Sequence, residues 1–70
     1  LKGLIVINAA GDVLGEVVRI METGGNDVLV IEPTATSTDK KPRLIPYVKE
    51  IIEEVSLTRG QILVNWLTSY

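Results

Sequence analysis

Short runs of valine, isoleucine and leucine, separated by turn-forming residues, dominate this chain. The apolar runs are Leu4–Ile7, Val13–Met21, Val28–Ile31, Arg43–Val48, Ile51–Leu57 and Gln61–Leu67. Gly, Asn, Asp or Pro clusters lie between most of these runs, and such spacing is typical of short strands in a small all-β barrel or sandwich. In a barrel, alternate residues of each strand point inward. We therefore expect an interior made mostly of Leu4, Val6, Leu14, Val17, Ile20, Leu29, Ile31, Ile45, Ile52, Ile62 and Val64.

Two features refine this expectation. Gly15 interrupts the second run, and a glycine inside a strand often marks a bulge or a sharp bend. The polar stretch Glu32–Pro42 reads as a mobile hairpin loop that tolerates changes in length.

The segment that follows Pro46 is ambiguous. Ile45, Val48, Ile51, Ile52 and Val55 recur at spacings of three and four, which fits an amphipathic helix as well as it fits a strand. Pro46 could begin such a helix at its first turn. A compromise is a single helical turn at Pro46–Lys49 followed by a strand from Ile51.

Composition excludes several kinds of site. The 70 residues include no cysteine and no histidine, so a thiolate metal site and a histidine general base are both impossible. The net charge of −2 argues against nucleic acid as the main partner, because phosphate binding needs a basic face. No apolar run approaches the about 20 residues of a membrane span. The chain begins with Leu1 rather than methionine, so it reads as a piece of a longer protein.

No residue pattern indicates catalysis or cofactor binding. Asp12, Glu16, Glu22, Asp27 and Glu32 read as turn and surface carboxylates, because glycosidase-type chemistry would need two of them across a pocket. Gly24-Gly25 lacks the lysine of a phosphate loop and the spaced glycines of a dinucleotide site. We therefore expect no enzyme activity, no cofactor and no metal.

The remaining candidates are contacts for a partner. Asn26-Asp27 first reads as a turn fixed by its own side chains, with ligand binding as a minority interpretation. Lys40, Lys41 and Arg43 form the only basic cluster, which could touch RNA but more simply keeps a loop solvated. Among the aromatic residues, we expect Tyr47 to be half-buried in packing. Trp66 is equally suited to cover one end of the core or to contact a partner.

Four phrases, taken in order, resemble a known family. They are Leu14-Gly15-Glu16-Val17, Glu22 to Val30, Arg43-Leu44-Ile45-Pro46-Tyr47-Val48 and Gly60-Gln61-Ile62-Leu63-Val64. Together with the opening Leu1-Lys2-Gly3-Leu4-Ile5-Val6, they resemble the C-terminal PRC-barrel domain of RimM ribosome maturation factors. The similarity covers nearly all of the chain, although Lys2 and Ile5 invert the apolar and polar choices that are usual in the family.

The resemblance implies a small antiparallel PRC-type β-barrel over residues 1–70, with one short helical turn. It implies a cytoplasmic, non-enzymatic domain that helps the small ribosomal subunit mature by binding ribosomal protein nineteen, without a small-molecule substrate. It also implies that an N-terminal β-barrel and an aromatic-rich stretch lie outside this chain. The alternative is a PRC-barrel module of another membrane- or RNA-associated protein. For partner contacts we expect Asn26, Asp27, Lys40, Lys41, Arg43 and Tyr47.

Overall fold

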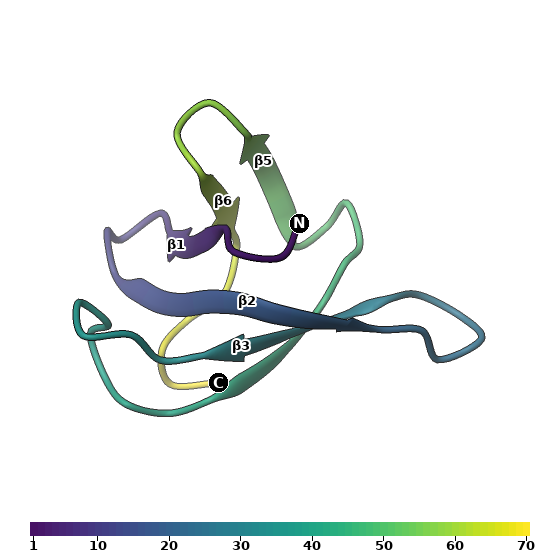
Figure 1. The fold of residues 1–70 in the computed structure, drawn as a ribbon, viewed down its shortest axis with the longest axis horizontal. Coiled ribbons are helices and arrows are strands. Elements are labelled where there is room, and N and C mark those ends of the chain that lie inside the picture. The colour runs from purple at the N-terminus through teal and green to yellow at the C-terminus, as the bar shows by residue number, and fades with distance from the viewer.

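The computed structural model describes residues 1–70 and contains six strands and no helix. The strands are β1 (Ile5–Asn8), β2 (Val13–Met21), β3 (Val28–Glu32), β4 (Arg43–Pro46), β5 (Ile52–Ser56) and β6 (Gln61–Val64). They form one sheet in the order β4-β3-β2-β1-β6-β5, in which only the β1–β6 pair is parallel. Figure 1 shows β2 and β3 running side by side across the molecule, with β5 and β6 standing at a steep angle above them. The predicted all-β class is confirmed.

The sheet curls around its core without closing into a complete barrel. Strands β4 and β5 are its two edges, and no ladder joins them. The predicted small β-barrel is confirmed with this minor difference, that an open seam remains between β4 and β5. No helix that could cross a membrane occurs in the structure.

The core lies on the inner face of the curled sheet. Its nine buried apolar residues are Leu4, Val6, Leu14, Val17, Leu29, Ile31, Ile45, Ile62 and Val64, all of which were expected inside. Ile20 and Ile52, also expected inside, are half-buried and pack against this core. Because each fully buried aliphatic side chain contributes roughly 1.5–3 kcal/mol, this cluster is the main source of stability.

Gly15 borders a β-bulge on β2 and also permits a close approach of β2 to β3. It has a φ of +147°, and a Cβ there would lie 2.3 Å from the backbone oxygen of Glu32 on β3. The extra residues of both register shifts lie on β2: Leu14 is skipped where Gly15 pairs with Val6 and Val13 with Ile7, and Val18 is skipped between Val17 and Arg19. The predicted irregularity at Gly15 is confirmed, and the position has a steric requirement for glycine as well.

The ambiguous segment forms a single turn and then a strand. The carbonyl of Val48 accepts hydrogen bonds from the N–H groups of Ile51 at 3.0 Å and Ile52 at 2.8 Å. Pro46 ends β4 instead of opening this turn, and β5 begins at Ile52. The predicted turn exists, but it begins two residues later than expected, since the β3–β4 ladder continues through Pro46.

The β3–β4 loop is held in place by its own hydrogen bonds. The Thr34 N–H donates to Ser37 Oγ at 2.8 Å, and the Thr38 N–H donates to the carbonyl of Val13 on β2 at 2.9 Å. These contacts tie the loop to β2 through both the backbone and the Thr38 hydroxyl, which accepts a hydrogen bond from the Val13 N–H at 3.2 Å, so the loop is more strongly held than its polar sequence predicts.

Candidate protein-docking surface

The expected contact residues fall into two groups at opposite ends of strand β3. Asn26, Asp27 and Tyr47 lie at the end where β3 begins and β4 ends. Lys40, Lys41 and Arg43 lie at the other end, in or next to the β3–β4 loop. The fold therefore does not bring all six residues into one patch.

Asp27 and Tyr47 are held next to each other by the backbone. The Tyr47 N–H donates to the carbonyl of Asp27 at 2.9 Å, which extends the β3–β4 ladder by one pair. The turn that contains Asn26 is closed by Thr23, whose Oγ1 donates to the carbonyl of Asn26 at 2.8 Å. We predicted that the Asn26 and Asp27 side chains would fix this turn; the Thr23 hydroxyl does so instead. Asn26 is exposed and Asp27 is half-buried.

A hollow of about 240 Å³ lies next to Tyr47, lined by Tyr47, Val48, Lys49 and Ile52. It lies at the end of the open seam where the chain passes from β4 to β5, because its walls are the link that follows β4 and the first residue of β5. Tyr47 is 38% exposed, so its ring forms part of the surface as well as part of the wall. A mostly apolar hollow with one lysine can receive an apolar side chain from another protein.

Fewer cationic side chains of the basic cluster are available to a partner than the sequence predicts. Lys40 Nζ donates to the carbonyls of Thr34 at 2.8 Å and Ala35 at 3.3 Å, so it is engaged within the loop. Lys41 is exposed, and its backbone N–H donates to Asp39. Of the three expected cations, Lys41 has the side chain most available to a partner.

Arg43 faces the interior instead of the solvent. Its guanidinium makes a bidentate pair with Asp39, at 2.9 and 2.7 Å, and the residue is only 7% exposed. Nη1 also donates to the carbonyl of Lys41 and Nη2 to that of Thr68, both at 3.1 Å. The signal that could have found this is strand alternation, since Arg43 lies two residues before the buried Ile45.

This ion pair shifts the ionisation of both partners. The hydrogen bonds from Arg43, with a further one from the Lys41 N–H, lower the pKa of the Asp39 carboxyl from 3.8 to about 2. The hydrogen bond to Asp39 raises the pKa of the Arg43 guanidinium. Arg43 is therefore a charged internal clamp that joins the β3–β4 loop to the C-terminal segment.

A second buried polar residue, which the sequence analysis missed, holds the same C-terminal segment. Asn8 is 4% exposed, and its Nδ2 donates to the carbonyl of Trp66 at 2.9 Å. Trp66 packs against the core and meets the ring of Tyr70 edge-on, with ring centroids 5.2 Å apart. In Figure 1 the last residues return from β6 across the sheet, where these contacts hold them. Of the two roles left open for Trp66, the structure places it at the core.

No three histidine, cysteine, aspartate or glutamate side chains lie together as a metal ligand set. Among the residues expected to contact a partner, the surface features that remain are the Asp27–Tyr47 end, with its apolar hollow, and the exposed Lys41.

Comparison with known proteins identifies the family of this chain. The family model of the RimM PRC barrel domain matches residues 1–68. The chain belongs to the RimM PRC barrel family. The RimM domain is 47% identical over 66 residues to the ribosome maturation factor RimM of Stutzerimonas stutzeri, and 42% identical over 66 residues to that of Pseudomonas fluorescens. In both cases the match covers 94% of this chain and 37% of the relative.

A crystal structure of a Pseudomonas aeruginosa protein, named as a 16S ribosomal RNA processing protein RimM, superimposes on the whole RimM domain. The TM-score is 0.97 at 37% identity, and the match covers 43% of that chain. The RimM domain thus spans less than half the length of these relatives.

Proposed function

We propose that this RimM domain is a non-catalytic binding module of a ribosome maturation factor, which attaches to the small ribosomal subunit while the subunit assembles in the cytoplasm. The observation that carries this proposal is membership of the RimM PRC barrel family, because its relatives are named ribosome maturation factors. The partner we propose is ribosomal protein nineteen, as the resemblance in sequence implies.

The Asp27–Tyr47 end is the contact surface that we propose. A rigid ladder places Tyr47 against the turn of Asn26 and Asp27, so little conformational entropy is lost when a partner binds. The hollow beside Tyr47 would receive an apolar side chain of the partner, with Lys49 at its rim available to an acceptor group. Tyrosine in such a position is a frequent hot spot, worth about 2 kcal/mol or more.

Lys40, Lys41 and Arg43 have different roles in this proposal. Lys41 adds a peripheral electrostatic contact, while Lys40 and Arg43 keep the loop in shape through hydrogen bonds. The net charge of −2 favours a protein partner over bare RNA phosphate.

The test is a titration of the ¹⁵N-labelled 70-residue chain with ribosomal protein nineteen, followed by backbone amide shifts. We expect the shifts to be confined to Asn26, Asp27 and Tyr47–Ile52. Tyr47→Ala should weaken binding about tenfold or more. Tyr70→Ala, which removes a more exposed tyrosine elsewhere, should leave binding unchanged. Shifts spread over the opposite end of β3, or none at all, would refute the assignment.

A further inference from the structure

A second hollow lies on the outer face of the sheet, away from the core. Strands β1 and β6 run parallel there, with Ile7 opposite Leu63. Both residues alternate with buried ones, so both point outward, and both are half-buried. They contribute the apolar part of a hollow of about 110 Å³ whose other lining residues are Glu54, Ser56, Arg59 and Gln61.

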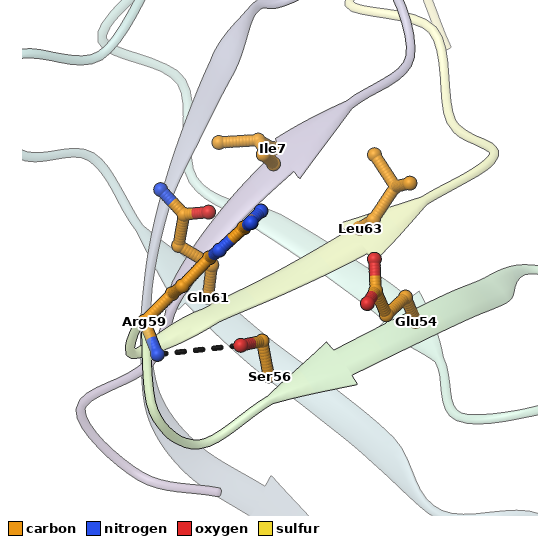
Figure 2. Close-up of a pocket in the computed structure, with 6 residues that line it drawn as sticks. All are labelled: Ile7, Glu54, Ser56, Arg59, Gln61 and Leu63. Carbon is orange, nitrogen blue, oxygen red and sulfur yellow. Dashed lines mark hydrogen bonds between the residues drawn. The ribbon is translucent and has the colours of Figure 1, made fainter.

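The polar lining residues are divided between two sides of this hollow. Figure 2 shows Arg59 and Gln61 on one side, and Glu54 next to Leu63 on the other. The backbone N–H of Arg59 donates to Ser56 Oγ at 3.2 Å, which fixes the β5–β6 turn. The turn therefore places Arg59 at the hollow through its backbone, and its guanidinium is left free.

Arg59 differs from the other two arginines in this respect. The Arg43 guanidinium binds Asp39, and Arg19 Nη2 contacts Met21 Sδ at 3.8 Å. The Arg59 guanidinium has no acceptor in the structure, and the Arg43–Asp39 pair is the single salt bridge. An unpaired guanidinium beside an amide and an apolar floor is a suitable receptor for a carboxylate on a short aliphatic stem.

The size of the hollow limits what it can hold. Sites for small-molecule ligands usually measure about 300–1,000 Å³, so 110 Å³ is too small for a cofactor or a metabolite. One side chain of a protein segment fits this volume better. We propose that this hollow is a second docking site, which takes a glutamate side chain of a protein partner.

In this site the methylene groups of the glutamate lie on Ile7 and Leu63, and its carboxylate accepts hydrogen bonds from Arg59 and Gln61. Glu54, on the far side of the hollow, repels the carboxylate of the bound glutamate. This repulsion favours the orientation in which that carboxylate lies towards Arg59 and away from Glu54. The site is independent of the Asp27–Tyr47 surface, because the two hollows share no lining residue.

The test uses the 70-residue chain and a capped peptide, Ala-Ala-Glu-Ala-Ala, with the same peptide carrying glutamine in place of glutamate as the reference. Backbone amide shifts during the titration should appear at Ile7 and at Glu54–Leu63. Binding should be about fivefold weaker for the glutamine peptide, which is the upper range for an exposed ion pair. Added salt should weaken binding of the glutamate peptide as well.

Three variants test whether peptide binding depends on the charged residues of this hollow. Arg59→Gln should reduce affinity to that of the glutamine peptide, while Arg19→Gln, at an arginine outside the hollow, should have no effect. Glu54→Gln should strengthen binding, because it removes the like charge. Equal shifts with both peptides, shifts elsewhere on the domain, or no shifts at millimolar peptide would overturn the proposal. None of these outcomes depends on ribosomal protein nineteen, so this test and that of the proposed function can fail separately.

Discussion

The Tyr47 N–H donates a hydrogen bond to the Asp27 carbonyl at 2.9 Å, which shows that the backbone N–H of Tyr47 points towards β3. Because alternate residues of a strand point their N–H and C=O groups to opposite sides, Arg43 and Ile45 face β3 together with Tyr47. Pro42, Leu44 and Pro46 then face the open edge. Neither proline has an N–H, so Leu44 has the only outward donor of this edge strand.

This arrangement predicts that the prolines keep the domain from associating through β4. Replacing both with threonine (Pro42→Thr, Pro46→Thr) adds two outward donors to an exposed strand edge. We expect self-association that increases with concentration, measured by sedimentation equilibrium. Pro33→Thr, at the proline that follows β3 and does not flank β4, is the control and should remain monomeric. A double variant that stays as monomeric as this control would show that other features protect the edge.

Alanine substitutions at three glycines separate the loss of stability caused by a steric collision from the loss caused by a positive φ. Gly15→Ala should reduce the free energy of unfolding by about 2 kcal/mol or more, because its φ is +147° and its Cβ would collide with Glu32. Gly24→Ala, at φ +85° in open space, should cost about 1 kcal/mol through φ alone. Gly25→Ala, with neither problem, should lie within about 0.5 kcal/mol of the parent chain. Urea denaturation measures all three, and equal losses would contradict the steric role of Gly15.

Arg43 should matter for stability more than for contact with a partner. Arg43→Met leaves the carbonyls of Lys41 and Thr68 without their donor, and we expect a loss of about 3 kcal/mol in the free energy of unfolding. Trp66 fluorescence should shift to longer wavelength at lower urea than in the parent, since the clamp on the C-terminal segment is lost. Arg19→Met, at an exposed arginine, is the matched control. If the two variants unfold alike, the clamp contributes little.

The Asp39–Arg43 pair also predicts how stability depends on pH. The pKa of Asp39 is about 2 in the folded chain and 3.8 in its ordinary state, so between these values the unfolded chain binds more protons. Stability from this pair is therefore complete above about pH 4 and is lost as the pH falls towards 2. Thermal unfolding should show a smaller acid-induced decrease for Asp39→Asn than for the parent, although the variant is less stable at neutral pH. An unchanged decrease would assign the acid sensitivity to other carboxylates.

Strand alternation made the apolar core predictable. Each residue of the nine-member core belongs to a short apolar run, and all but Leu14 follow the alternation, which needs no knowledge of distant contacts; Leu14 and Gly15 are both buried at the β2 register shift. The buried polar residues depend on such contacts. Asn8 binds a carbonyl 58 positions away and Arg43 one 25 positions away, so local pattern could not identify their partners.

The candidate contacts were predictable only as residue types at the surface. Sequence neighbours such as Lys41 and Arg43 were grouped, yet a strand start between them turns one to solvent and the other to the interior. The seam beside Tyr47 was missed because it results from β4 and β5 remaining unpaired, which is a property of the whole sheet. The hollow at Arg59 likewise requires the parallel β1–β6 pairing.

The central claim is that this domain by itself contacts the assembling small subunit through the Asp27–Tyr47 end. The most direct measurement is competition: labelled full-length RimM of Pseudomonas aeruginosa is co-sedimented with immature small subunits in the presence of increasing amounts of the 70-residue chain. We predict that the chain displaces the full-length protein and that the Tyr47→Ala chain fails to do so at the same concentration. Undiminished co-sedimentation at saturating amounts of the parent chain would contradict the account.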